Sequence, residues 1–180
     1  MYIMILQQYK IVFAGSMGAG KTEAIRSLSE IPVLATEAFN TDDQSHKKMN
    51  TTVGIDYGEV TLEDGNKVGL YGTPGQGRFD FMWGVICKGA IGMILLIDHS
   101  IENPLKDLEF YINIFKQYGN NLVIGITHVD EDPNKSTHQY RQWLLERQLN
   151  FPVFFIDARK KDDVLLLLET LITAVEVDYL

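Results

Sequence analysis

The octet at residues 15–22 constrains this chain more than any other feature of its sequence. It reads Gly-Ser-Met-Gly-Ala-Gly-Lys-Thr and fits the phosphate-binding pattern G-x-x-x-x-G-K-[S/T] at every position. A short apolar run at 11–14 precedes it and a helix-compatible segment at 22–29 follows it. An ordinary strand-turn-helix could have the same shape, but the full match predicts a loop whose backbone N–H groups surround a polyphosphate at a helix N-terminus.

The residues of the octet have separate expected roles. Lys21 is expected to reach the β- and γ-phosphates of a nucleotide and so to take part in catalysis. Thr22 is expected to place its hydroxyl on a Mg²⁺ ion that bridges the same phosphates. The residues of this loop expected to bind the nucleotide are Gly15, Gly18, Ala19, Gly20, Lys21 and Thr22.

Composition narrows the class of protein. A chain of 180 residues with 46% hydrophobic positions predicts one globular domain, residues 1–180. The net charge of -8 argues against nucleic acid as a partner, because phosphate backbones favour clustered Lys and Arg. The single cysteine, Cys87, excludes an intrachain disulfide and suits a reducing cytoplasm. The longest apolar run, 90–97, is too short to span a membrane, and neither end has a lipidation signal, so we expect no direct membrane anchor.

Short apolar runs alternate with longer helical patterns along the chain, which predicts an α/β fold with a mostly parallel sheet. Residues 31–50 lose periodicity and are expected to form a long loop. Runs at 55–62 and 67–71 flank an Asp-Gly pair, which predicts a hairpin and therefore one antiparallel strand. Further strands are expected at 91–97, 122–126 and 152–156.

Helix boundaries are also readable. Asn103 followed by Pro104 predicts a helix start, and Gly119 predicts its end near Tyr118. Ser136 with a glutamine three residues later predicts a capping box for a helix through 149. A final helix is expected over about 163–175, with the apolar run 164–168 mainly in the core. A stripe at helical spacing after residue 78 is either core-facing or a partly exposed aromatic contact surface; it comprises Phe79, Met82, Trp83 and Ile86.

Four further segments at expected strand ends accompany the phosphate loop. They are Thr-Val-Gly-Ile-Asp-Tyr-Gly at 52–58, Gly-Thr-Pro-Gly-Gln at 72–76, Thr-His-Val-Asp at 127–130 and Asp-Ala-Arg at 157–159. In these segments the chain resembles the small GTPases of the Ras superfamily. It is most similar to the bacterial Ras-like group, relatives of the gliding-motility GTPase, that works with Roadblock/LC7 proteins. The resemblance runs from about residue 10 to the end, and it implies a three-layer P-loop fold with a six-stranded mixed sheet and helices on both faces.

The resemblance also implies a switch region around the γ-phosphate. Thr52 is expected to complete Mg²⁺ coordination, with Thr51 as the alternative. Gly75 would offer its amide to the γ-phosphate, and Gln76 would orient the attacking water. Arg78 would either approach the transition-state charge as an arginine finger or only position the second switch.

The segment at 72–76 departs from the family pattern at one position. Gly72 stands where the family has an aspartate linked to Mg²⁺, so the metal lacks a nearby carboxylate there. Asp56 and Asp98 are the candidates to supply the missing charge.

The last two segments are expected to bind the base. By resemblance, Asp130 accepts hydrogen bonds from N1–H and the 2-amino group of guanine, a pair that adenine does not offer. Thr127 and His128 replace the family's asparagine and lysine. The backbone N–H of Ala158 would meet guanine O6, with Arg159 beside it.

The predicted function is therefore a guanine-nucleotide switch that binds GTP and GDP with Mg²⁺ and hydrolyses GTP slowly unless a partner assists. Two alternatives stay open. One is a nucleotide-binding interaction module without hydrolysis, favoured by Gly72 and the changed pair at 127–128. The other is an ATP-dependent small-molecule kinase, although the loops at 31–50 and 131–136 contain none of the arginines that such a lid carries. His99 and His138 have no partner pattern for a metal site or a catalytic dyad, so we expect them to be structural or solvated.

Overall fold

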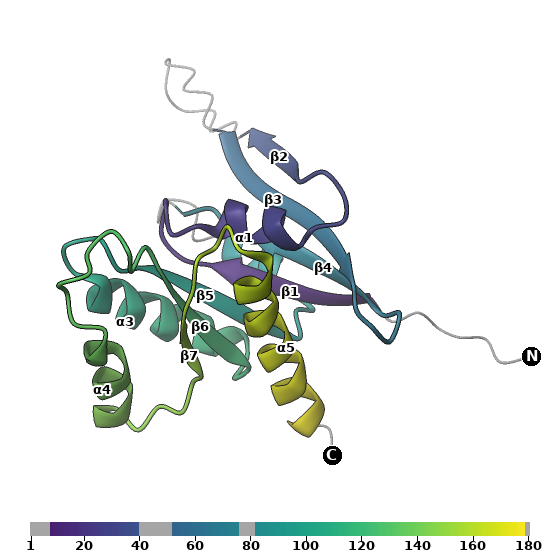
Figure 1. Ribbon diagram of the computed structural model, residues 1–180. Coiled ribbons are helices and arrows are strands. Elements are labelled where there is room, and N and C mark those ends of the chain that lie inside the picture. The colour runs from purple at the N-terminus through teal and green to yellow at the C-terminus, as the bar shows by residue number, and fades with distance from the viewer. Residues whose placement is uncertain (1–7, 40–51, 76–81, 179–180) are drawn as a thin grey trace, which may run out of the picture.

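The computed structural model describes residues 8–39, 52–75 and 82–178, and the structural statements below concern these residues. They form one seven-stranded sheet with helices packed against it (Figure 1). In chain order the elements are β1 (Gln8–Ala14), α1 (Lys21–Leu28), β2 (Leu34–Phe39), β3 (Thr52–Thr61), β4 (Lys67–Gly72), α2 (Trp83–Cys87), β5 (Gly92–Asp98), α3 (Pro104–Phe115), η2 (Lys116–Tyr118), β6 (Leu122–Thr127), α4 (His138–Glu146), β7 (Val153–Phe155) and α5 (Lys161–Asp178).

The sheet has the order β2-β3-β4-β1-β5-β6-β7. β3 pairs antiparallel with both β2 and β4, whereas the pairs from β4 through β7 are all parallel. The expected α/β fold with a mixed sheet and one antiparallel strand is therefore confirmed. The carboxyl ends of the parallel strands meet at one edge, where an open α/β sheet places its ligand site.

The predicted number of six strands was wrong because β2 forms inside the segment expected to be a loop. β2 has no alternating pattern of its own, and its first residue, Leu34, is 54% exposed. It is held by backbone pairing along β3, from Leu34 opposite Tyr57 to Phe39 opposite Thr52. β2 thus forms because the long strand β3 offers a free edge for pairing. The local sequence of β2 does not indicate such a pairing.

Two cores cover the two faces of the sheet. Along β1, Ile11 and Phe13 point into a core with α1 and α5, and the alternate residues Val12 and Ala14 point into a second core with α2, α3 and α4. All four side chains are fully buried. Because both faces of the central strands are covered, these strands read as continuous apolar runs. Figure 1 shows α1 and α5 lying together in front of the sheet.

Several predicted boundaries are confirmed. The side chain of Asn103 accepts a hydrogen bond from the Lys106 backbone N–H at 3.3 Å, and Pro104 opens α3. The helical path ends at Tyr118 in a short 3-10 turn, followed by Gly119. α5 is longer than predicted, from Lys161 to Asp178.

The apolar run 164–168 lies mainly in the core, as expected. Val164, Leu167 and Leu168 are fully buried, whereas Leu166 is 45% exposed. For the stripe after residue 78, the core-facing interpretation is confirmed at Trp83 and Ile86, because both side chains are buried. Phe79 lies outside the described residues.

The predicted capping box at Ser136 was wrong. α4 begins two residues later, at His138, and ends at Glu146 rather than at 149. The physical reason is a tertiary contact: the Lys135 ammonium donates to the backbone oxygens of His99, at 2.9 Å, and Ile101. This contact holds the preceding segment as a loop against the end of β5, and the helix begins only after it.

Candidate functional site

The phosphate loop connects β1 to α1 and takes a path that glycine permits. Gly15, Gly18 and Gly20 all have positive φ, at 142°, 86° and 98°. A Cβ on Gly15 would lie 2.2 Å from the backbone oxygen of Leu96, so the loop runs directly against β5. A Cβ on Gly18 would meet nothing within 4 Å. The two glycines therefore meet different demands: close backbone approach at Gly15 and conformation alone at Gly18.

Lys21 lies at the centre of this loop. Its side chain is buried, and its ammonium donates to the backbone oxygens of Gly15 at 2.8 Å and Ser16 at 2.7 Å. Burial lowers the pKa of Lys21 to about 8, an effect that the nearby charge of Asp56 opposes. The loop thus holds a desolvated cation at the N-terminus of α1. There the lysine charge and the helix dipole both stabilise a bound anion.

A carboxylate reaches Thr22 from the neighbouring strand. The Thr22 hydroxyl donates to Oδ2 of Asp56 in β3. In the β3–β4 register Asp56 is directly opposite Gly72, which stands where the GTPases that the chain resembles have an aspartate. A Cβ on Gly72 would lie 3.2 Å from the Cβ of Asp56 and 3.1 Å from the Ile25 side chain. The space beside Gly72 is therefore taken by the Asp56 side chain, and a carboxylate from the facing strand lies beside Thr22.

Asp98, the other carboxylate considered, has different partners. Its Oδ1 accepts from the backbone N–H of Ser100 at 2.9 Å and from the Ser100 hydroxyl at 2.6 Å. The same oxygen lies 3.4 Å from Nδ1 of His128. These contacts direct Asp98 toward the base end of the site, so Asp56 is the carboxylate at Thr22.

The segment after β4 crosses the phosphate loop. A Cβ on Gly75 would lie 2.5 Å from the backbone nitrogen of Met17, so only glycine fits at this crossing. Thr52 is the first residue of β3, but its side chain, like the whole of Thr51, Gln76 and Arg78, lies outside the described residues.

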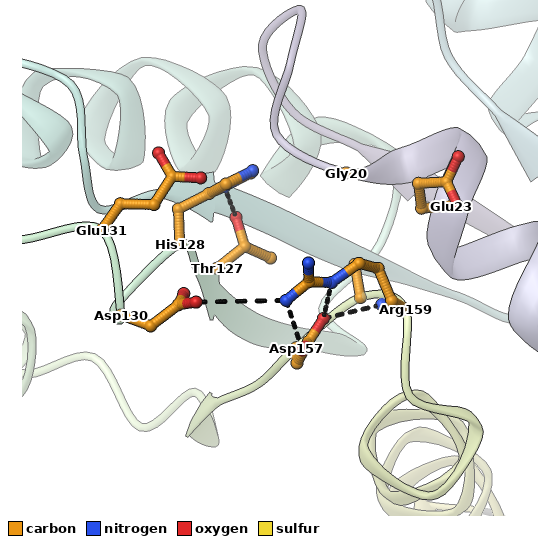
Figure 2. Close-up of a pocket in the computed structure, with 9 residues that line it drawn as sticks. Gly20, Glu23, Thr127, His128, Asp130, Glu131, Asp157 and Arg159 are labelled. Carbon is orange, nitrogen blue, oxygen red and sulfur yellow. Dashed lines mark hydrogen bonds and ion pairs between the residues drawn. The ribbon is translucent and has the colours of Figure 1, made fainter.

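The expected base-binding residues come from two loops that meet beside the phosphate loop (Figure 2). Thr127 is the last residue of β6, His128 and Asp130 follow that strand, and Ala158 and Arg159 follow β7. They line one pocket together with Gly20 and three carboxylates that were not among the expected site residues, which are Glu23, Glu131 and Asp157.

Thr127 and Ala158 connect this pocket to the phosphate loop. The Thr127 hydroxyl is buried and lies 3.0 Å from the backbone oxygen of Ala19, to which it donates. It also lies 2.9 Å from Nδ1 of His128, a residue in the left-handed conformation with φ of 56°. The Cβ of Ala158 lies 2.9 Å from the position of a Cβ on Gly20. The two ends of the site are therefore in direct contact.

Arg159 and the two aspartates form a charged group at the pocket mouth (Figure 2). Nε and Nη2 of Arg159 donate to the two carboxylate oxygens of Asp157, each at 2.8 Å. Nη2 also lies 4.0 Å from Oδ2 of Asp130. The hydrogen bonds from Arg159 hold the pKa of Asp157 well below its usual range, and the same bonds raise the pKa of Arg159. Opposite charges two residues apart were the sequence signal that could have identified Asp157.

The two histidines expected to be structural or solvated are so. His99 is fully buried, with Nδ1 2.6 Å from the Tyr140 hydroxyl and Nε2 3.2 Å from the backbone oxygen of Lys135. His138 is exposed at the start of α4. In the described ranges, no three His, Cys, Asp or Glu side chains cluster as a metal site, and no helix is long and apolar enough to cross a membrane.

Comparison with known proteins identifies relatives among the Ras-related proteins, although no protein-family model matches the chain. Sec4 of Candida albicans is 24% identical over 170 residues, covering 91% of this chain and 73% of that protein. Human Rab-8B is 30% identical over 118 residues, covering 64% and 51%. An uncharacterized protein of Methanocaldococcus jannaschii is 32% identical over 102 residues, covering 57% and 58%. The chain thus spans little more than half the length of two of these relatives.

A solved structure supports the fold. The G domain of the T. maritima FeoB iron transporter superposes with a TM-score of 0.67 at 20% identity, covering 93% of this chain and 98% of that one. The chain therefore has the α/β fold of a P-loop GTPase G domain. The sequence relatives agree with the predicted resemblance to the Ras superfamily, and the narrower bacterial group stays a prediction.

Proposed function

We propose that this protein is a guanine-nucleotide switch that binds GTP and GDP with Mg²⁺ and slowly hydrolyses GTP. One observation carries the proposal: a phosphate loop with a buried lysine is in direct contact with a pocket that presents Asp130. The Thr127 bond to Ala19 fixes the two ends relative to each other. A single ligand with a polyphosphate at one end and a base at the other matches this arrangement.

Phosphate binding is assigned to Lys21 and the loop amides of residues 15–22. Lys21 is bonded to two backbone oxygens and is already desolvated, so its charge acts on the phosphates with little screening. The close approach of Gly75 to the loop backbone supports its proposed role, which is to offer its amide to the γ-phosphate. Binding and charge neutralisation by these groups account for most of the catalysis expected in phosphoryl transfer.

The residues beside Lys21 fit a Mg²⁺ ion. Thr22 and Asp56 offer hydroxyl and carboxylate oxygens, which are the ligands Mg²⁺ prefers, and a nucleotide-bound Mg²⁺ needs only one or two such protein ligands. Thr52 is proposed as a further ligand from its sequence position. When bound, Mg²⁺ would neutralise phosphate charge during transfer.

Base recognition is assigned to the pocket after β6 and β7. Asp130 accepts from N1–H and the 2-amino group of guanine, and the Ala158 N–H donates to O6, whereas adenine presents the opposite pattern of donors and acceptors. His128 and Arg159 flank Asp130 among the residues that line this pocket.

Hydrolysis and regulation rest on the resemblance. Gln76 is proposed to orient water and Arg78 to act in the second switch, with a Roadblock/LC7-type protein as partner. A bacterial origin is proposed on the same grounds. A cytoplasmic location is proposed from the single cysteine, and the absence of nucleic acid as a partner from the net charge of -8.

Asp130→Asn tests the base assignment. The new amide should lower GTP affinity about tenfold or more and favour xanthine nucleotide. The two accepting oxygens of the Asp130 carboxylate become one accepting oxygen and one donating NH₂ group, and the donor fits the carbonyl that xanthine has in place of the 2-amino group. Titration of the purified protein with GTP, XTP and ATP measures this, with Asp107→Asn on α3 as a control outside the pocket. Unchanged GTP affinity would mean that Asp130 does not read the base. Tighter binding of ATP than GTP by the parent protein would contradict the guanine assignment and support the kinase alternative.

Single-turnover GTP hydrolysis tests the enzymatic part. We expect slow phosphate release that stops in Gln76→Leu. No phosphate release, even with a candidate activator, would leave the interaction module as the better description.

A further inference from the structure

The best-held charged side chain in the base pocket is one that the guanine-reading scheme leaves without a role. Arg159 donates to both oxygens of Asp157 through Nε and Nη2, and its backbone N–H donates to Oδ1 of the same carboxylate at 3.0 Å. The backbone N–H of Asp157 donates in turn to Asp163 in the first turn of α5, at 2.8 Å. The guanidinium is therefore anchored to the fold although 70% of the Arg159 side chain is exposed.

Asp130 has the opposite character. Its side chain is 78% exposed. In the described part of the chain, its one polar side-chain partner is Arg159, at 4.0 Å from Nη2 to Oδ2. A carboxylate this free must be ordered when it binds a base, and that ordering costs side-chain conformational entropy.

The charges around the pocket explain why a cation is needed there. Four carboxylates line it, and Arg159 is the one Lys or Arg among the lining residues that the structure describes. Those carboxylates are Glu23, Asp130, Glu131 and Asp157. Without the guanidinium, Asp157 and Glu131 would repel the Asp130 carboxylate and disfavour a fixed position between them.

We propose that Arg159, anchored by Asp157, is a positioning residue that orients Asp130 and thereby sets the selectivity for guanine over bases that lack a 2-amino group. This rests on the proposed function. A carboxylate reads guanine through two parallel hydrogen bonds, and the second, to the 2-amino group, depends on alignment of the carboxylate plane. Hypoxanthine keeps N1–H but has no 2-amino group, so it reports the first bond alone.

The experiment compares GDP with IDP. Dissociation constants of both nucleotides are measured for the parent protein, Arg159→Ala, Arg159→Lys and Asp157→Asn. Arg147→Ala, at the residue directly after α4, serves as the matched control because its guanidinium packs on Trp143 outside the pocket.

We expect Arg159→Ala to weaken GDP binding about tenfold and IDP binding about twofold, which narrows the GDP-to-IDP preference about fivefold. Arg159→Lys should recover part of the preference, because a lysine keeps the charge but cannot form the fork to Asp157. Asp157→Asn should narrow the preference less than Arg159→Ala does. Arg147→Ala should leave both constants unchanged.

Other outcomes overturn the inference. Equal loss of GDP and IDP affinity would mean that Arg159 contacts the base or ribose without orienting Asp130. Tighter binding of both nucleotides by Arg159→Ala would mean that the arginine obstructs the pocket. On an Asp130→Asn background, Arg159→Ala should leave the preference unchanged, and a further narrowing would contradict the proposal.

The failure of the proposed function is recognisable separately. If the parent protein binds neither GDP nor IDP, the guanine-nucleotide assignment fails. If the parent binds GDP and Arg159→Ala keeps the parent's preference, only the inference about Arg159 fails. Arg159→Gln, which preserves side-chain length without charge, repeats the test if the alanine variant does not fold.

Discussion

The phosphate end and the base end of the site differ in burial and in the groups that hold their charged side chains. At the phosphate end, Lys21 is 7% exposed and bonded to backbone oxygens, and Gly15 is pressed against the backbone of β5. At the base end, Asp130 and Arg159 are 78% and 70% exposed and are held through other side chains. Backbone groups therefore define the phosphate end, and exposed polar side chains define the base end.

The phosphate loop and the base pocket also differ in how closely they match the pattern of the Ras-like GTPases that the chain resembles. The octet at 15–22 matches its pattern without a mismatch, and its glycines and Lys21 act through backbone conformation and backbone contacts. At 127–130 and 157–159 the side chains differ from the pattern while the loops still meet in one pocket.

The largest effect is expected from Gly15→Ala. The new Cβ would lie 2.2 Å from the Leu96 oxygen, so the loop or β5 must shift. We expect nucleotide affinity to fall at least 100-fold and the free energy of unfolding to fall by about 3 kcal/mol. Nucleotide titration and chemical denaturation measure the two effects.

Gly18→Ala is the matched control for that change. It has the same left-handed requirement but open space around the Cβ, so a destabilisation of about 1 kcal/mol and a retained nucleotide site are expected. If both variants behaved alike, close backbone approach would not be what distinguishes the phosphate end.

A smaller effect is expected from Asp56→Asn. Mg²⁺ is expected to slow the release of GDP from the parent protein. Without the charge beside Thr22, this effect of Mg²⁺ on the release rate should be about tenfold smaller, whereas the release rate measured in EDTA should change little. Fluorescent-GDP release over a Mg²⁺ titration measures this.

Gly72→Asp on an Asp56→Gly background is the corresponding rescue, because residues 56 and 72 face each other across β3 and β4 and removal of the Asp56 side chain frees the space beside residue 72. We expect it to restore part of the Mg²⁺ dependence. A parent-like Mg²⁺ response in Asp56→Asn alone would show that this carboxylate has no part in metal binding.

The smallest effect is expected at the junction of the two ends. Thr127→Val removes the hydroxyl that donates to the backbone oxygen of Ala19, so that this oxygen loses the Thr127 donor. We expect about 1 kcal/mol less stability and a few-fold weaker GDP binding, whereas Thr127→Ser keeps both. Equal behaviour of the valine and serine variants would mean that the ends are aligned by backbone packing alone.

The sequence predicted most elements correctly because their signals are local. The Asn103 cap and the apolar strand runs depend on neighbours a few residues away. The failures at β2 and at Ser136 share a cause: each depends on a partner distant in sequence, the edge of β3 for one and the Lys135 contacts for the other. Local patterns carry no record of such partners.

The candidate site divides in the same way. By itself the sequence determined the phosphate loop, since eight consecutive residues contain both the glycine conformations and the lysine that the loop needs. Only the tertiary structure decided that Asp56 rather than Asp98 reaches Thr22, because the register of β3 against β4 sets which residue faces Gly72. It likewise placed Arg159 between Asp157 and Asp130, from loops after two different strands. Backbone conformation is encoded locally, whereas the meeting of charged side chains depends on how strands align in the sheet.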